Sequence, residues 1–143
     1  MVTAHLDELE LMSGWGESDP TMRGRVNFPL YAAHGSEASA TVYFEVDPGD
    51  HIGRHTDSAE EILFIVDGTG EAVVGDERVP VTRGALALVP ELVPHDVYAT
   101  GDTPLRVLGF FAAATIESVF DETMEPMGRR VLGTPPVEAT VQH

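Results

Sequence analysis

The 143-residue sequence contains no cysteine, no lysine and no long apolar run. Without cysteine, disulfides, thiolate metal sites and cysteine nucleophiles are excluded. No stretch approaches the roughly 20 apolar residues that a membrane-spanning helix needs. Residues 1–10 include three acids and no base, so we do not expect a secretory signal. We therefore expect a cytoplasmic protein whose chemistry uses His, Asp, Glu, Ser, Thr, Tyr or a metal.

Positive charge is also scarce. The 8 basic residues, all arginine, face 24 acids, which gives a net charge of -16. Nucleic-acid backbones and anionic membranes would repel such a surface, so we predict that neither is a partner. The acidic excess suits a salt-adapted proteome or a high-GC genome, and neither origin bears on the reaction. The length and the 43% apolar content fit one globular domain.

Turn signals recur about every eight to twelve residues from position 47 onward, which is typical of all-β domains. The segments between them are short and rich in Val, Ile, Leu, Phe and Tyr, and we predict strands at 40–46, 61–66, 71–74, 78–81, 85–89, 95–99 and 105–112. The dipeptide Gly75-Asp76 indicates a tight hairpin. These features predict a sandwich or barrel.

The two ends of the chain lack this pattern. We predict an irregular N-terminal extension over residues 1–24, in which Leu6 and Leu9 fit one helical turn, followed by a barrel over 25–115. Residues 116–143 form the predicted C-terminal extension. Its Ile116, Val119 and Phe120 have helical spacing, so a short helix is expected there, followed by an extended tail.

Several potential metal ligands have strand spacing. His55 and Asp57 are two residues apart, so on a strand they share a face. Glu61 follows a predicted bend, and His95 begins another strand after two prolines. His51, four residues before His55, is either an additional ligand, a proton shuttle or a solvent-facing loop residue. We predict that His34 is a loop residue, and His5 and His143 are too close to the ends to support a role.

Two segments resemble the paired motifs of the cupin superfamily. The first motif contains Gly, His-x-His, Glu and Gly, and the matching positions are Gly49, His55, Glu61 and Gly68, with Asp57 in place of the second His. The second contains Gly, Pro-x-Gly, His and Asn, and the matching positions are Gly84, Pro90 and His95, with Leu92 and Ala99 in place of the second Gly and the Asn. The resemblance implies a double-stranded β-helix (jelly-roll) barrel in a single domain.

The resemblance further implies one divalent metal held by His55, Glu61 and His95. Asp57 would replace the usual imidazole, either as a direct ligand, through a water or as a hydrogen-bond acceptor for a ligand. A carboxylate hardens the site, which favours Fe or Mn, while Zn, Ni, Co or Cu remain possible. Glu61 could serve as both ligand and catalytic proton acceptor.

Strand alternation extends the predicted site to a substrate pocket. We expect it to be lined by Phe44, Leu63, Ile65, Val97, Ala99 and Phe110. Such an apolar lining favours a small organic substrate over a phosphate or a sugar nucleotide.

The sequence therefore predicts a mononuclear metal-dependent cupin that acts on a small organic molecule, with dioxygenase-type chemistry first. Isomerase, cyclase or decarboxylase activity is the near alternative, and a non-catalytic small-molecule-binding cupin is the alternative from another class. We also expect a homodimer, because edge strands and a sheet face need cover and N-terminal strands commonly pair across subunits in proteins of this kind.

Overall fold

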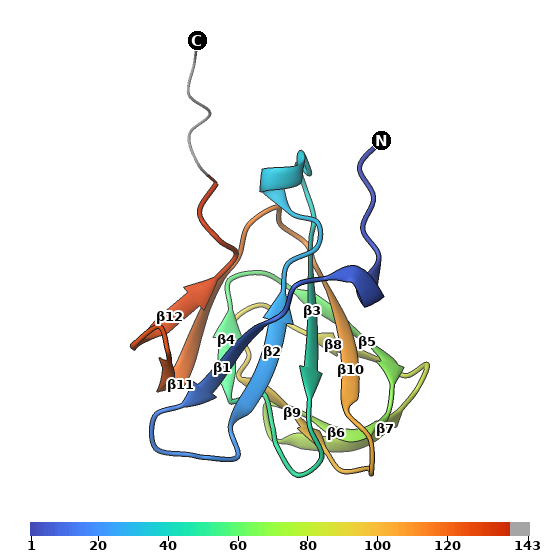
Figure 1. The fold of residues 1–143 in the computed structure, drawn as a ribbon, viewed down its shortest axis with the longest axis vertical. Helices are drawn as coiled ribbons and strands as arrows, with labels where there is room; N and C mark the ends of the chain where they lie inside the picture. The colour runs from blue at the N-terminus through green and yellow to red at the C-terminus, as the bar shows by residue number, and fades with distance from the viewer. Residues whose placement is uncertain (138–143) are drawn as a thin grey trace.

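A computed structural model describes residues 1–137, whose regular structure is almost entirely β-strand (Figure 1). The strands are β1 (Met12–Gly16), β2 (Arg23–Asn27), β3 (Ala40–Val46), β4 (His55–Asp57), β5 (Glu61–Asp67), β6 (Thr69–Val74), β7 (Glu77–Thr82), β8 (Leu86–Val89), β9 (His95–Ala99), β10 (Leu105–Phe111), β11 (Glu117–Glu125) and β12 (Arg129–Gly133). Two short 3-10 helices, η1 (Leu6–Glu8) and η2 (Ala32–His34), precede β1 and β3. Within residues 1–137, no helix is long and apolar enough to cross a membrane.

The strands form one curled antiparallel sheet in the order β7-β6-β9-β4-β11-β1-β2-β3-β10-β5-β8, and β12 pairs with β11. Curling brings β4 and β9 opposite β3, β10 and β5, as Figure 1 shows. The prediction of an all-β fold is confirmed, and the strands expected between residues 40 and 112 start or end within two residues of their observed bounds.

The ends of the chain are more regular than predicted. Strand β1 lies within residues 1–24 and pairs with β2 and β11, while η1 matches the expected helical turn. The helix predicted from Ile116 is wrong, because β11 begins at Glu117. Burial of Ile116, Ser118 and Phe120 follows a period of two, as a strand against a core requires. Residues 138–143 of the predicted tail lie outside the described part of the chain.

Alternation along β5 shows how the core is built. Glu61, Leu63 and Ile65 are buried, whereas Ile62 between them is exposed. Apolar side chains from β3, β9 and β10 meet them inside the barrel, including Val42, Phe44, Val97, Val107 and Phe111. The packing that buries Leu63 and Ile65 therefore also turns the Glu61 carboxylate inward, despite its charge.

The loop between β8 and β9 contains a strained residue. Leu92 has a φ of 62°, in the left-handed region that favours glycine, and its side chain is largely exposed. Its backbone N–H donates to the carbonyl oxygen of Asp57 at 3.0 Å, so the loop is tied to β4. Leu92 stands where the second motif has glycine, and the positive φ explains that preference.

We expect Leu92→Gly to stabilise the protein. Release of the left-handed strain of about 1–2 kcal/mol outweighs the extra chain entropy of glycine, which leaves a net gain of about 0.5–1 kcal/mol. Thermal unfolding should show a midpoint higher by about 2–5 °C.

Val79→Gly is the matched control, since Val79 is also exposed but lies within β7. Glycine weakens a strand, so this variant should unfold at a lower temperature. Equal losses of stability in both variants would contradict the strain at Leu92.

Candidate metal centre

The candidate ligands lie on three strands that converge inside the barrel. His55 and Asp57 belong to β4, while Glu61 and His95 are the first residues of β5 and β9. Strand β4 pairs with β9 at His55 and His95, and the centroids of the two imidazole rings are 4.2 Å apart. Positions far apart in the sequence are thus neighbours in the fold.

One group of three residues has the spacing of a metal site. The ligand atoms of His55, Asp57 and His95 all lie within 4.8 Å of one another. Asp57 Oδ2 is 3.0 Å from His95 Nε2 and 3.6 Å from His55 Nε2. Glu61 is outside this tight group, although its Oε1 is 3.4 Å from His95 Nε2. The geometry favours Asp57 over Glu61 as the nearest carboxylate.

Backbone and hydroxyl groups orient the three side chains. His55 Nδ1 is 2.7 Å from the carbonyl oxygen of Gly53, and His95 Nδ1 is 3.0 Å from that of Val93. A carbonyl oxygen only accepts, so each Nδ1 bears a proton and each Nε2 faces the centre, from which it could bind a metal. The Ser118 hydroxyl donates to Asp57 Oδ1 at 2.5 Å, which leaves Oδ2 facing the two imidazoles.

Two buried polar atoms at this point lack hydrogen-bond partners. Among the described residues, Asp57 Oδ2 and His95 Nε2 are the buried side-chain atoms left unsatisfied. Their separation suits a hydrogen bond, but their alignment does not. An unsatisfied buried atom costs about 1–3 kcal/mol, and more if it is charged. A cation between these atoms would satisfy both, so the residues present fit a metal ion.

Burial and mutual charge shift the pKa values of the cluster. Desolvation raises the pKa of Glu61 to about 7, and the negative charge of Asp57 adds to this rise. Burial alone would lower the pKa of His95, but the adjacent carboxylates of Asp57 and Glu61 outweigh it and raise the value to about 10. Burial and the charge of His95 lower the pKa of His55. Desolvation would raise the pKa of Asp57, but the two imidazoles and the Ser118 hydroxyl outweigh it, so its pKa is lowered.

Comparison with known proteins identifies the family. The model of the cupin domain matches residues 42–111, which contain all four candidate ligands. A cupin 2 domain-containing protein from Halorhodospira halophila is 26% identical, with a TM-score of 0.57, over 62% of this chain and 63% of that one. The chain belongs to the cupin superfamily. The family match confirms the resemblance of the two sequence motifs to those of cupins.

Other solved structures share the jelly-roll barrel. The polyketide cyclase RemF from Streptomyces resistomycificus has a TM-score of 0.64 at 17% identity, with 78% of each chain covered. Oxalate decarboxylase from Bacillus subtilis has a TM-score of 0.69 at 22% identity, over 81% of this cupin but 30% of that chain. An uncharacterized protein from Methanocaldococcus jannaschii is 31% identical over 51 residues, which are 36% of this chain and 41% of that protein. These likenesses establish the fold.

The candidate ligands border a large cavity of this cupin. It has a volume of about 750 Å³, and its lining is mostly apolar. Phe44, Leu63 and Val97, which were expected in a substrate pocket, line this cavity. Ile65 and Ala99 were also expected there, but the structure packs both in the barrel core without contact with the cavity. Strand alternation therefore correctly predicted that Ile65 and Ala99 point into the barrel. It did not predict that the cavity ends before it reaches them.

The expected pocket role of Phe110 is wrong. Leu105, Val107, Gly109 and Phe111 are the inward residues of β10, so Phe110 points outward and is 45% exposed. Phe111 lines the cavity instead. The error is one residue in register, which moves a side chain to the opposite face of a strand.

His51 lies outside the candidate metal centre. Its Nδ1 is 2.7 Å from Asp96 Oδ2 and its Nε2 is 2.9 Å from Asp19 Oδ2, so both ring nitrogens already face carboxylates. The expectations of an additional ligand, a proton shuttle or a solvent-facing residue are therefore corrected to an ion-paired imidazole. His34, expected in a loop, ends η2 and lines the cavity, where its Nδ1 accepts from the Tyr31 N–H.

Three residues that shape the candidate centre were not predicted from the sequence. Ser118 orients Asp57, and Phe120 stacks on His55. Both lie in the segment that was predicted to be a helix. Their i, i+2 spacing was the signal that could have revealed them. Gly109 is the third residue, and it leaves room for Glu61. A Cβ at position 109 would overlap Glu61 Oε2 and lie 2.8 Å from Val42 Cγ1. A glycine within a strand is a cue to such close approach.

Proposed function

We propose that this cupin is a mononuclear metal-dependent enzyme that acts on a small apolar organic molecule, with oxygenase chemistry first. The observation that carries the proposal is the pair of unsatisfied buried atoms, Asp57 Oδ2 and His95 Nε2, at the edge of a cavity of about 750 Å³. Perturbed titratable groups beside an apolar cavity are a physical mark of active sites.

The donor set supports the choice of metal and reaction. His55, His95 and Asp57 supply two imidazoles and one carboxylate, the combination typical of non-haem iron oxygenases. A carboxylate donor favours Fe or Mn, with Zn, Ni, Co or Cu as alternatives. When bound, the metal would supply a Lewis acid for a substrate oxygen and, as iron, a redox centre for dioxygen.

Glu61 is proposed as the proton-transfer group. Its carboxyl has a pKa raised to about 7 by burial, near the value that suits a general acid or base at neutral pH. Gly109 leaves room for the carboxylate against β10, and His95 Nε2 lies 3.4 Å from it. Glu61 can therefore hold or release a proton beside the atoms that would bind the metal.

The cavity lining indicates the substrate class. Its apolar wall includes aromatic and methionine side chains, namely Met12, Phe28, Tyr31, Phe44, Phe111, Phe120, Met124 and Met127. Arg129 is the only arginine among the described lining residues. Such a wall would orient an apolar, aromatic-sized molecule and exclude water, whereas a phosphorylated substrate would meet little positive charge.

Glu61 also favours a second candidate, an isomerase, cyclase or decarboxylase. Such reactions need proton transfer and a Lewis acid but no dioxygen. A cupin that only binds its small molecule is the third outcome, and metal content and turnover separate the three.

We also propose that this cupin forms a homodimer. The outer faces of β8, β5 and β10 bring Leu88, Ile62 and Phe110 into one cross-strand row, beside exposed Leu86. Charged side chains are absent from this row, so two acidic chains could approach there with little repulsion. The N-terminal strands, expected to pair between subunits, pair with β3 and β11 of their own chain.

Metal reconstitution tests the centre. After anaerobic incubation with Fe(II) or Mn(II) and desalting, we expect about one equivalent of metal by elemental analysis. His95→Ala and Asp57→Ala should each retain less than about a fifth of an equivalent, because each removes a donor and leaves buried charge unbalanced.

His5→Ala and Glu60→Ala are the matched controls, since both residues are exposed, and both variants should load fully. Asp57→His should raise the affinity for Ni(II), because it adds an imidazole beside His95. Full occupancy in both site variants would refute the ligand assignment, and less than about a tenth of an equivalent in the wild type would favour a binding protein.

Oxygen dependence tests the reaction class. We expect the Fe(II)-loaded protein to convert apolar phenols or enolisable ketones in air, with oxygen uptake at an electrode matching product by mass spectrometry. These compounds carry an oxygen donor and a proton that Glu61 could accept. Turnover that persists under nitrogen would replace the oxygenase with the proton-transfer alternative, and Glu61→Gln should slow either reaction.

Light scattering after size-exclusion chromatography tests the assembly. We expect twice the 15.4 kDa chain mass. Leu86→Glu combined with Leu88→Glu should give the monomer mass, because charge on both sides of the contact would repel. Val79→Glu is the control, since Val79 is 53% exposed on β7, which pairs with β6 and not with β8, β5 or β10. A wild-type monomer at tens of micromolar would count against the dimer.

A further inference from the structure

The segment that delivers His55 to the centre contains a bulge. Residue His51 pairs with Tyr98, and His55 pairs with His95, so four steps along one strand match three along the other. The additional residue lies around Gly53, whose φ is 111°. Bulges occur beside active sites because they redirect a side chain, and this one sets the direction of His55.

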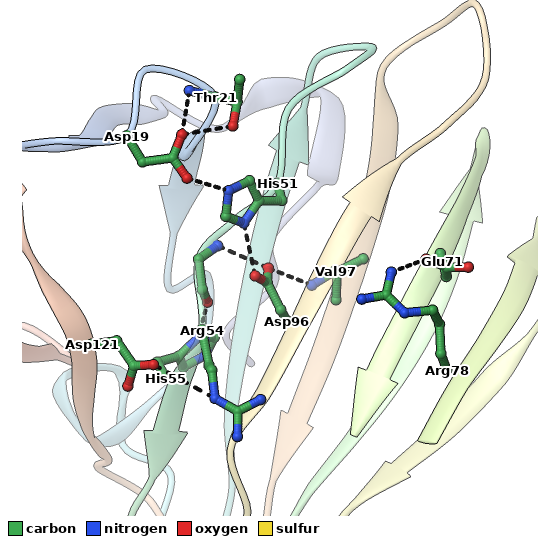
Figure 2. A network of polar contacts seen from close by, with 11 residues as sticks. Asp19, Thr21, His51, Arg54, His55, Glu71, Arg78, Asp96, Val97 and Asp121 are labelled. Atoms are coloured by element: carbon green, nitrogen blue, oxygen red, sulfur yellow. Dashed lines mark hydrogen bonds and ion pairs between the residues drawn. The ribbon is translucent and has the colours of Figure 1, made fainter. Parts of the chain in front are cut away.

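The Asp96 side chain replaces the backbone pairing that the bulge loses. Asp96 lies between His95 and Val97 on β9 and is 4% exposed. Its Oδ1 accepts from the N–H groups of Gly53 at 2.9 Å and Val97 at 2.7 Å. Figure 2 shows this carboxylate between the two segments. Strand β4 pairs with β9 at a single residue pair, and the Ile52 N–H donates to the Val97 carbonyl before the bulge, so the Asp96 bond to Gly53 connects the two segments between these points.

His51 holds the other oxygen of Asp96. Its ring lies between Asp96 and Asp19 in Figure 2, with one carboxylate at each nitrogen. Both nitrogens must donate to be satisfied, so the ring is an imidazolium. The hydrogen bond to Asp96 is the main cause that raises the pKa of His51 to about 9, against desolvation. Tyr98 stacks on the ring at 4.6 Å, and Thr21 donates twice to Asp19.

From these contacts we infer that Asp96 is a positioning residue for the metal centre, acting through the Gly53 peptide on His55. The N–H of Gly53 binds Asp96, and its carbonyl accepts from His55 Nδ1 at 2.7 Å. A shift of this peptide therefore rotates the imidazole and moves its Nε2 away from Asp57. The His51 imidazolium keeps the carboxylate in place from the surface side. The role rests on the proposed metal-dependent function.

The test measures metal binding and ring geometry in folded variants. For Asp96→Ala we expect Co(II) affinity, measured by chelator competition, to fall by about 10–100-fold, the usual effect of losing a group that orients a ligand. The visible spectrum of bound Co(II) should also change. In the metal-free protein, nitrogen NMR of His55 should show loss of the single Nδ1–H tautomer. Asp96→Asn retains an acceptor oxygen for Gly53 and should stay within about threefold of the wild type.

Asp47→Ala is the control, because it removes a carboxylate ion pair with Arg25 outside the cavity. It should lower the unfolding temperature without changing Co(II) affinity. His51→Ala is the second variant in case Asp96→Ala does not fold, and we expect at least threefold weaker binding. Wild-type affinity and spectrum in a folded Asp96→Ala or His51→Ala variant would overturn the inference.

The failure of the proposed function is distinguishable from the failure of this inference. If the wild type binds no metal, the metal-dependent function fails, and the His55 tautomer in metal-free Asp96→Ala decides the positioning role by itself. A retained Nδ1–H tautomer there contradicts the role, and a mixed or inverted tautomer supports it.

Discussion

The close approach of two carboxylates and two imidazoles inside an apolar barrel is the constraint on which the site depends. Burying ionised groups is costly unless opposite charge balances them. The protein brings Asp57 within 3.0 Å of His95 without an aligned hydrogen bond between them. A cation between Asp57 Oδ2 and His95 Nε2 would satisfy both atoms, which gives the cluster the character of a binding site.

The rest of the barrel holds this cluster in place. Backbone carbonyls fix the rings of His55 and His95, and β11 supplies Ser118 to orient Asp57. The pairing of β4 with β9 is short, and the Asp96 carboxylate supplements it with a bond to the Gly53 N–H. The bulge around Gly53, held by the Asp96 carboxylate, turns the His55 side chain in a direction that a regular strand would not give it.

Sequence patterns were most informative where one periodicity dominated. Alternation and turn residues located the strands from 40 to 112, and the two motifs marked His55 and His95. Prediction failed where two periodicities fit the same residues. Ile116 and Phe120 are four apart, which suits a helix, yet both are also even positions along a strand. The parity of β10 was likewise open until its neighbours were known, so Phe110 was chosen in place of Phe111.

The sequence by itself determined the all-β class, the cupin family and the candidate ligand types, because these follow from local residue pattern and spacing. Only the tertiary structure decided that Asp57 lies nearer than Glu61 to both imidazoles, that His51 pairs with Asp96 and that β11 closes the site. Those outcomes depend on register and on contacts between distant segments. One residue of register reverses the face of a side chain, and no local pattern records which distant strand will be its neighbour.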